Sequence, residues 1–293
     1  MCYRSFGEKV IHSISLSAFA KINVGLKITN RLPNGYHCIH SLFQEINLND
    51  TVDITRTNSQ NIDFSASGLD VPEDSSNLCV KSANYFCEKF GITEGFHIHL
   101  EKRIPIGSGL GGGSSDAAAT LIGLRTLTKI NISDNQMIKL SAKIGADVPF
   151  FINGGLQLAE NIGDKLTPIK EHIFKDYIFV LVKPNFDIST SWAYSELRKT
   201  LQLDKLGHKF APILKPIKWQ LFENDFEKVI LPSYPEVGRI KQVLIEHDAL
   251  HACLSGSGST VFGVFHNNET ALKAVELLPS YQTFLTLPKY RHL

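Results

Sequence analysis

IPIGSGLGGGSSDAA, residues 104–118, is the most informative segment of this chain. Five of the seven residues from Gly107 to Gly113 are glycine, and the hydroxyls of Ser114 and Ser115 follow. Glycine lets backbone N–H groups turn toward a ligand because no Cβ stands in the way. Amides that converge at the start of a helix form an anion site, to which the helix dipole adds positive potential. The stretch therefore predicts a polyphosphate-binding loop that leads into a helix.

Known glycine-rich motifs compete for this loop. Gly107, Gly109 and Gly112 satisfy G-x-G-x-x-G, but the preceding FHIHLEKRIP alternates in polarity, unlike the buried parallel strand of a dinucleotide fold. A Walker loop needs a lysine after the glycines, whereas serine follows Gly113. A protein kinase needs His-Arg-Asp and Asp-Phe-Gly strings, and the chain has neither. A plain Gly/Ser linker is disfavoured because DAAATLIGLRTL continues the stretch as an apolar helix face.

The composition is that of an ordinary globular protein. The chain has 293 residues, 43% hydrophobic and 20% charged, with a net charge of +1, so neither nucleic acid nor a membrane surface is indicated as a partner. No apolar stretch reaches about 18 residues, so no transmembrane helix is expected. The cysteines are scattered, odd in number and without a C-x-x-C pair, which favours free thiols in a reducing, cytoplasmic compartment. They are Cys2, Cys38, Cys79, Cys87 and Cys253.

The N-terminus has some features of a signal peptide. Arg4 and Lys9 precede VIHSISLSAFA, in which Ala18 and Ala20 resemble a cleavage site. Polar and apolar residues alternate through this segment, however, and a period of two indicates a strand rather than an apolar signal region. We therefore expect a strand here, with residues 1–12 as an extension before it.

Local periodicity predicts mixed strands and helices in both halves of the chain. Strands are expected at 13–29, 39–56, 96–102 and 177–184 and on both sides of a turn within 249–265. Helices are expected at 76–90, 114–129, 133–144, 188–201, 219–230 and 270–278. The Gly- and Asn-rich segment 152–164 indicates a boundary between two α+β domains, 1–158 and 159–293.

Two further segments could carry function. SGSGST, residues 255–260, lies between apolar strands and fits a hairpin turn. GADVPFF, residues 145–151, places Asp147 directly after a helix in apolar surroundings. A carboxylate there is either an ordinary helix cap or a catalytic base in a pocket of low dielectric constant, and the residues alone leave both open.

Together these segments resemble a known family. PIGSGLGGGSSDAA is similar to the phosphate loop of the GHMP superfamily, which comprises galactokinase, homoserine kinase, mevalonate kinase and phosphomevalonate kinase. The order and spacing match the member of the non-mevalonate isoprenoid route that acts on a cytidine diphosphate-linked polyol. The matching segments are AFAKINVGL (18–26), NGYHCIHSLFQ (34–44), GADVPFF (145–151) and LSGSGSTVF (254–262).

The resemblance runs from about residue 15 to the C-terminus and implies both a fold and a reaction. The fold is α+β, with an N-terminal domain like the second domain of ribosomal protein S5, a ferredoxin-like C-terminal domain, and the active site between them. The reaction moves the γ-phosphate of ATP to a hydroxyl, a step that depends on positioning and charge stabilisation.

The resemblance also implies catalytic and ATP-binding residues. Asp147 matches the base and Lys21 the cation that keeps it ionised; Asn23, on the same strand face as Lys21, would bind the substrate by holding its hydroxyl or the base. The ATP-binding positions are Pro105, Ile106, Gly107, Ser108, Gly109, Leu110, Gly111, Gly112, Gly113, Ser114 and Ser115, with Asn77 and Lys102 on the adenine or ribose side. Mg²⁺ would come with ATP and could meet the two serines. The alternative for Lys102 is a solvated surface charge.

The implied substrate side is a pocket for a cytidine diphosphate group. Tyr36 would stack on the cytosine and His37 would hydrogen-bond to its edge, although a turn aromatic and a satisfied histidine are the alternatives. Tyr194 would be the second aromatic of a sandwich, where some members carry phenylalanine. Thr190 would contact the same ligand, and Gly256, Ser257 and Gly258 would line its diphosphate and sugar end.

Three alternatives for the function remain, of which a NAD-dependent dehydrogenase is the most distant, because the context of the glycine loop does not fit a dinucleotide fold. Another kinase of the superfamily would act on a small alcohol such as homoserine or mevalonate, and Tyr36, His37 and Tyr194 argue against it. A nucleotide-binding protein without activity could share the fold, and the intact Lys21 and Asp147 argue against that.

Overall fold

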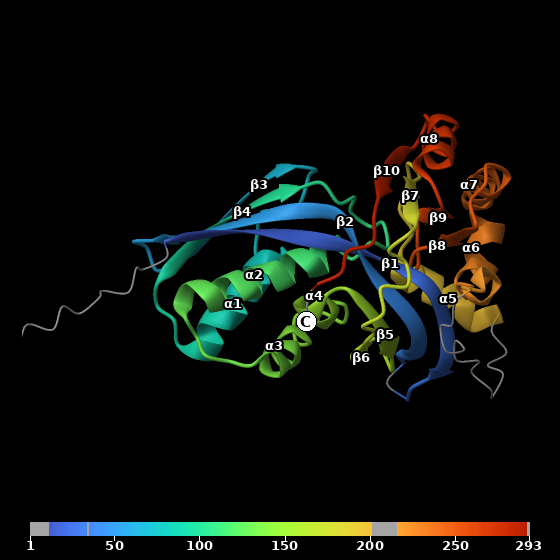
Figure 1. The fold of residues 1–293 in the computed structure, drawn as a ribbon. Helices are drawn as coiled ribbons and strands as arrows, with labels where there is room; N and C mark the ends of the chain where they lie inside the picture. The colour runs from blue at the N-terminus through green and yellow to red at the C-terminus, as the bar shows by residue number, and fades with distance from the viewer. Residues whose placement is uncertain (1–11, 34, 201–215, 292–293) are drawn as a thin grey trace, which may run out of the picture.

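The computed structural model describes residues 12–33, 35–200 and 216–291, and a long hairpin runs through both of its parts (Figure 1). The hairpin consists of β1 (Ser13–Arg31) and β2 (His37–Thr57), which pair antiparallel with local register shifts. The middle of β1 is buried on both faces. Ala20, Ile22 and Val24 pack in one apolar cluster with residues of the second sheet. Because side chains alternate along a strand, the residues between them point to the opposite face, where the site lies.

The first sheet is built around β2. This strand pairs with β1, β4 (Gly95–Lys102) and β5 (Leu156–Glu160); β3 (Ile62–Gly68) runs parallel to β4, and β6 (Lys165–Pro168) pairs with β5. Helices cover one face of this sheet (Figure 1). They are α1 (Leu78–Phe90), α2 (Gly112–Thr128), α3 (Asp134–Ser141) and α4 (Val148–Asn153). The apolar face of α2 predicted from the sequence is buried in this core.

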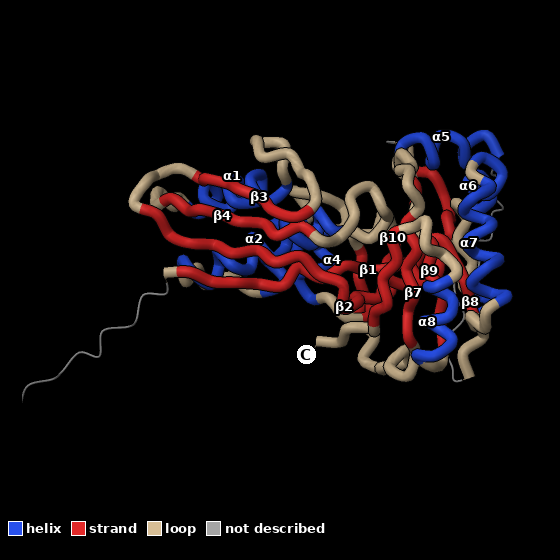
Figure 2. The backbone as a smooth tube through the Cα atoms, turned by 90° about the horizontal axis from the view of Figure 1, so that it is seen from above, coloured by secondary structure: helices blue, strands red, loops and turns tan. Residues whose placement is uncertain are grey.

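The second sheet has the strand order β10-β7-β9-β8 and is antiparallel throughout. Its helices lie on the side away from the first sheet (Figure 2). The strands are β7 (Ile178–Lys183), β8 (His251–Leu254), β9 (Val261–Phe265) and β10 (Gln282–Thr286), and the helices are α5 (Thr190–Thr200), α6 (Glu227–Ser233), α7 (Pro235–Glu246) and α8 (Asn268–Glu276). This β-α-β-β-α-β arrangement is ferredoxin-like and confirms the expected α+β class.

The expected domain boundary after residue 158 falls inside β5. Both β5 and β6 belong to the first sheet, because β5 pairs with β2 and β6 pairs with β5. A cut at 158 would therefore separate a strand from its own ladder. We propose residues 169–177, between the last strand of the first sheet and β7, as the boundary.

The expected helix over 219–230 is wrong in its middle. The chain forms a 3₁₀ turn at Trp219–Leu221, and α6 begins only at Glu227. Between them the backbone pairs with β1, since Leu26 N donates to Glu223 O at 2.9 Å and Asp225 N donates to Leu26 O at 2.9 Å. This pairing holds the segment extended and overrides its helical periodicity.

Some expectations concern the ends and composition of the chain. Residues 1–11 of the N-terminal extension, with Cys2, lie outside the described residues. Cys38, Cys79, Cys87 and Cys253 are free thiols, as the sequence predicted. In the described part of the chain, none of the helices has the length and apolar character that crossing a membrane requires.

Candidate active site

A larger and a smaller cleft adjoin where the glycine loop, the β1–β2 hairpin and the 255–260 loop come together. The larger cleft has a volume of ≈ 790 Å³ and the smaller one ≈ 370 Å³, and Gly109, Gly111, Ser114 and Thr190 line both. The larger cleft brings together the expected catalytic and substrate residues Lys21, Asn23, Tyr36, His37, Asp147, Thr190, Tyr194, Gly256 and Ser257. Most of the expected ATP-binding residues line the smaller cleft, together with Gly258.

Lys21 and Asp147 face each other in the larger cleft. Lys21 Nζ lies 3.7 Å from Asp147 Oδ2, and it also donates to Asn23 Oδ1 at 2.6 Å. The ammonium sits 5.1 Å from the ring centroid of Phe43. Burial lowers the pKa of Lys21, and the neighbouring Asp147 carboxylate opposes that shift. The pair therefore places a buried cation beside a carboxylate that is open to the cleft.

Asp147 precedes α4 at the N-cap position, yet its side chain makes no capping hydrogen bond. The side chain is 37% exposed and lines the cleft. An ordinary cap would bind the backbone N–H groups of the first helical turn. The structure therefore does not support the cap alternative, and the carboxylate is available to a ligand.

Asn23 is held in one orientation by its neighbours. Its Nδ2 donates to Ser41 Oγ at 2.9 Å, and Ser41 Oγ donates to the Gly25 carbonyl at 2.7 Å. Because the amide nitrogen is used in this way, the amide oxygen faces Lys21. Asn23 therefore orients the ammonium that meets Asp147.

Aromatic side chains line the far end of the larger cleft. The rings of His37 and Tyr194 stack with centroids 5.0 Å apart, and Tyr36 is 59% exposed beside them. Burial lowers the pKa of His37, and the guanidinium groups of Arg198 and Arg31 lower it further. His37 is thus held in its neutral form at neutral pH. Arg198 lines this cleft one helical turn after Tyr194, a spacing from which the sequence could have predicted it.

The 255–260 loop is both the hairpin turn between β8 and β9 and a wall of the site. It docks on the glycine loop through Ser255 Oγ, which donates to Gly109 O at 3.0 Å, and Thr260 N, which donates to Ser108 O at 3.2 Å. Gly109 has a φ of +77°, and a Cβ there would overlap the carbonyl oxygen of Ser255. Glycine is therefore required where the two loops meet.

The structure excludes two expected ATP-binding side chains from the clefts. Leu110 is fully buried in the core, and its carbonyl accepts Lys21 N at 2.9 Å. Ser115 is 2% exposed and lines neither cleft, whereas Ser114 lines both. Successive helical residues point about 100° apart, so Ser115 turns toward the core while Ser114 faces the clefts.

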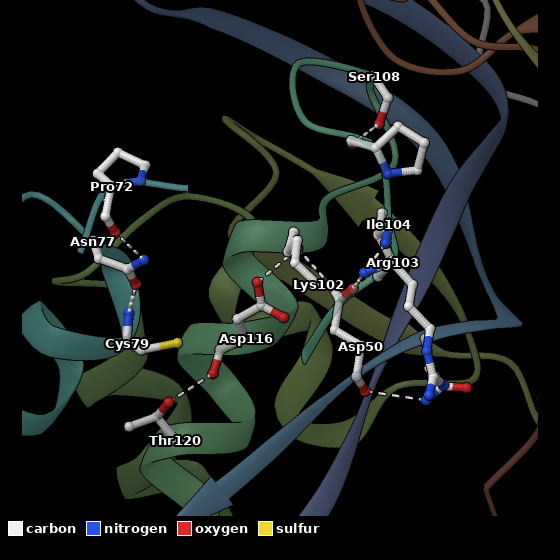
Figure 3. Close-up of polar contacts among 12 residues, drawn as sticks. Asp50, Pro72, Asn77, Cys79, Lys102, Arg103, Ile104, Ser108, Asp116 and Thr120 are labelled. Atoms are coloured by element: carbon white, nitrogen blue, oxygen red, sulfur yellow. Dashed lines mark hydrogen bonds and ion pairs between the residues drawn. The ribbon is translucent and has the colours of Figure 1, made fainter. Parts of the chain in front are cut away.

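Lys102 is not a solvated charge. It is 4% exposed, and its ammonium lies between the carboxylates of Asp50 and Asp116, with Asp116 Oδ2 at 2.7 Å (Figure 3). The other oxygen of Asp50 accepts Ile104 N at 2.8 Å and so fastens the chain just before the glycine loop. No local pattern marks Asp50, because its partners lie about fifty residues away in the chain.

Asp116 is the other carboxylate that the sequence did not single out, although it directly follows Ser115 in the decisive stretch. Burial raises the pKa of Asp116 to about 8; the nearby Asp50 acts in the same direction and Lys102 opposes it. Asp116 Oδ1 is buried without a hydrogen-bond partner among the described residues, and the residue lines the smaller cleft. One ammonium and two carboxylates would carry a negative charge, so a proton on Asp116 makes the buried cluster neutral.

Asn77 lines the smaller cleft while it caps α1. Its Oδ1 accepts Cys79 N at 2.8 Å and its Nδ2 donates to Pro72 O at 2.8 Å (Figure 3). Within the described ranges, no group of three or more His, Cys, Asp and Glu side chains is arranged to hold a metal ion. The polar lining of both clefts thus consists mainly of backbone amides, hydroxyls and single charged groups.

Comparison with known proteins agrees with this geometry. The family model of the GHMP kinases N terminal domain matches residues 77–155, and that of the GHMP kinases C terminal domain matches residues 210–281. Proteins named 4-diphosphocytidyl-2-C-methyl-D-erythritol kinase from Pelodictyon phaeoclathratiforme and Thermodesulfovibrio yellowstonii are 39% and 40% identical over 287 and 282 residues. These matches cover 96% and 92% of this chain and 99% and 95% of the relatives.

Solved structures point the same way. A crystal structure of 4-(cytidine 5'-diphospho)-2C-methyl-D-erythritol kinase matches with a TM-score of 0.80 at 29% identity, over 94% of this chain and 100% of that one. A homoserine kinase from Cytophaga hutchinsonii shares the fold, with a TM-score of 0.70 at 18% identity over 98% of both chains. The two family models and the relatives near 39% identity show that this chain belongs to the GHMP kinase family.

Proposed function

We propose that the chain is an ATP-dependent kinase that phosphorylates the 2-hydroxyl of 4-diphosphocytidyl-2-C-methyl-D-erythritol in the non-mevalonate route to isoprenoid precursors. The observation that carries this proposal is one continuous cleft with the Lys21–Asp147 pair beside the glycine loop and Tyr36, His37 and Tyr194 at its other end. The kinases of this name that align over almost the whole chain support the same substrate.

In this proposal, Asp147 takes the proton of the attacking hydroxyl. Phosphoryl transfer depends mainly on alignment and charge stabilisation, with a positioned carboxylate receiving that proton. Lys21, 3.7 Å from Asp147, stabilises negative charge on the reacting oxygens and is itself oriented by Asn23. These three side chains come from β1 and the N-terminal end of α4, so rigid elements hold them.

The ATP phosphates would lie against the backbone amides of Gly109–Gly113 at the start of α2. The positive end of the helix dipole faces that position, as at other phosphate sites. Asn77 and Lys102 line the same smaller cleft, and the adenine or ribose would lie on their side of it. Mg²⁺ prefers oxygen ligands and is commonly held through substrate phosphates, and the Ser114 hydroxyl at the junction of the clefts fits that chemistry. When bound, the ion neutralises phosphate charge.

Replacing Gly113 with valine should weaken ATP binding without disturbing the fold. Gly113 is exposed and lines the smaller cleft, and a Cβ there meets only Leu78 at an ordinary 3.5 Å. A branched side chain would therefore enter the space proposed for phosphate. Calorimetric titration with an ATP analogue should show at least about a tenfold loss of affinity, or 1.4 kcal/mol.

Gly112 would be a poor choice for this test. It is buried, and a Cβ there would lie 2.9 Å from Ile104 Cγ2 and 2.9 Å from Lys102 Nζ. Gly123→Ala, deep in α2, is no better because it would strike Ile54. Unchanged ATP affinity in a folded Gly113→Val variant would contradict the phosphate-loop assignment.

Cytosine is proposed to bind at the aromatic end. A neutral His37 can both donate to and accept from a base edge, which a protonated imidazole cannot do. Tyr36 supplies an exposed ring for stacking, and the hydroxyls of Thr190 and Ser257, 2.8 Å apart, face the same cleft. Binding energy at this end is far from the reacting hydroxyl and serves to position it.

Competition kinetics test the proposed substrate. CDP should compete with the cytidine-linked substrate and not with ATP, and methylerythritol phosphate without the cytidylyl group should be a very poor substrate. Tyr36→Ala should raise the activation free energy that corresponds to kcat/KM for the full substrate by about 1–3 kcal/mol, because the stacking ring is lost. The matched Tyr36→Phe keeps that ring and should retain most of the wild-type kcat/KM. Phosphorylation of homoserine or mevalonate at a comparable rate would replace this proposal with a small-alcohol kinase.

A further inference from the structure

The short helix α4 is held at both ends by side chains of the β1–β2 hairpin. Lys21 and Glu45 are directly paired across the two strands, so their side chains leave the same face of the sheet. Lys21 reaches Asp147 at the N-terminal end of α4, while Glu45 Oε2 accepts Gly155 N at 2.9 Å just beyond its C-terminal end. α4 is only six residues long, so a displacement of one end is transmitted to the other.

Glu45 is paired with Arg291, the last residue that the structure describes. The Glu45 side chain has no exposed surface, and both of its oxygens meet the Arg291 guanidinium, with Nε to Oε2 at 3.0 Å. Arg291 Nη1 also donates to Phe151 O at 3.3 Å, a carbonyl in the last turn of α4. One guanidinium thus binds the carboxylate that holds Gly155 and a helix carbonyl that would otherwise lack a partner.

The C-terminal segment reaches this position by crossing from the second sheet to the first. After β10 it runs along β2 toward α4 (Figure 1), and Asn47 N donates to Leu287 O at 3.0 Å. Farther along, Lys289 N donates to Glu45 O at 2.7 Å. Arg291 therefore enters on a backbone that is already fastened to the strand carrying Glu45.

Packing connects α4 to the rest of the site. Phe150 meets Phe43 edge-on with centroids 5.4 Å apart, and Phe43 is the ring beneath the Lys21 ammonium. Phe151 lies against Gly111 of the glycine loop, where a Cβ would approach its ring to 2.8 Å. The position of α4 therefore bears on Asp147, on Lys21 and on the glycine loop together.

We propose that Glu45 and Arg291 are positioning residues for phosphoryl transfer, forming a clamp that fixes α4 and thereby the distance between Asp147 and Lys21. The proposal rests on the function of Asp147 proposed above. A buried ion pair is a weak source of net stability, because desolvation offsets most of the attraction, but it imposes a strict geometry. Gly154 has a φ of +61°, and a Cβ there would overlap the side chains of both Glu45 and Arg291. The ion pair therefore packs directly against the backbone at the C-terminal end of α4.

Arg291→Ala tests the clamp by steady-state kinetics. We expect kcat to fall about 10- to 100-fold, since a small misplacement of a reacting group costs that much. KM for ATP and for the cytidine-linked substrate should stay within about twofold, because neither cleft loses a lining residue. The matched control is Arg125→Ala, whose side chain is 27% exposed against 29% for Arg291 and is paired with Asp134 far from the clefts. That variant should keep wild-type kcat.

Rescue separates positioning from general damage. A cavity of ≈ 240 Å³ lined by Gly154, Gly155, Tyr290 and Arg291 leaves room for a small cation. Guanidinium at low millimolar concentration should restore part of kcat in Arg291→Ala and nothing in wild type. Arg291→Lys keeps the charge but lacks the planar fork, so its kcat should fall between those of Arg291→Ala and wild type. If Arg291→Ala does not fold, Arg291→Lys and Glu45→Gln provide the same comparison.

Hydrogen exchange gives a readout that does not depend on activity. In Arg291→Ala the amides of α4 and of Gly155 should exchange faster, and those of α2 should not. Wild-type kcat in folded Arg291→Ala, or equal losses in the Arg125→Ala control, would overturn the clamp. A wild-type protein without kinase activity would overturn the proposed function. If Arg291→Ala still showed the selective change in exchange, the structural part of the clamp, which fixes α4, would stand.

Discussion

Asp147→Asn is expected to lower kcat about 10²–10⁴-fold, the usual contribution of a positioned general base. Asparagine keeps the size and polarity of the side chain but cannot take up the hydroxyl proton. The carboxylate makes no capping hydrogen bond, so the exchange removes no helix cap. ATP and substrate affinity, measured by calorimetric titration, should stay close to wild type. Single-turnover kinetics with preformed ternary complex would measure the loss in the chemical step itself.

The control for this variant is another acid at a helix start. Asp134 is the first residue of α3 and is 67% exposed. Asp134→Asn should leave kcat unchanged, since its carboxylate lies in neither cleft. The transition state of phosphoryl transfer can be loose, so proton removal contributes less than in many other reactions. A loss of kcat near the lower limit of about 10²-fold would therefore still agree with Asp147 as the base. Wild-type kcat in a folded Asp147→Asn variant would show that this residue is not the base.

Lys102→Met should destabilise the protein by about 3–5 kcal/mol, the cost of leaving buried charge without its partner. The Lys102 ammonium lies between Asp50 and Asp116 and balances the one negative charge that remains when Asp116 carries its proton, and all three side chains are almost fully buried. Methionine has a similar length and is apolar, so the change removes the charge with little loss of volume. Urea unfolding followed by circular dichroism would measure the difference in the free energy of unfolding.

A second substitution identifies the source of that loss. Asp50→Asn in the Lys102→Met background removes the carboxylate that Lys102 neutralises and should recover part of the stability. In the wild type, the raised pKa of Asp116, about 8, means that its contribution is present at low pH and is lost as the pH rises through 8. Asp116→Asn alone should therefore flatten the fall in stability between about pH 4, near which this carboxyl titrates in the unfolded chain, and pH 8, near which it titrates in the folded protein. An unchanged free energy of unfolding in Lys102→Met would show that the cluster is not a net source of stability.

Local sequence determined the glycine loop, the helix behind it and most long elements. Glycine spacing and an apolar helix face are properties of neighbouring residues, so residues 104–118 suffice to predict the loop. The elements that were missed are mostly short or lie at edges, such as β3, β6 and β10, where few residues carry any periodic pattern. α7 was missed because it begins at Pro235 directly after α6, which contains Pro232, and proline usually signals an end.

The motifs of the sequence identify the family, and the resemblance to it implies five site residues that the fold brings into one cleft: Lys21, Asn23, Tyr36, His37 and Asp147. Each lies in a short segment that can be matched without knowledge of the fold. The charged groups that become buried, and the partners that hold them, can be identified only in the folded protein. The sequence left open whether Lys102 binds ATP or is a solvated surface charge, and only the fold shows that Asp50, 52 residues earlier in the chain, lies against its ammonium. Likewise, Glu45 gains its partner Arg291 from 246 residues away. The state of a buried charge depends on neighbours in space, and the chain brings those neighbours together only when it folds.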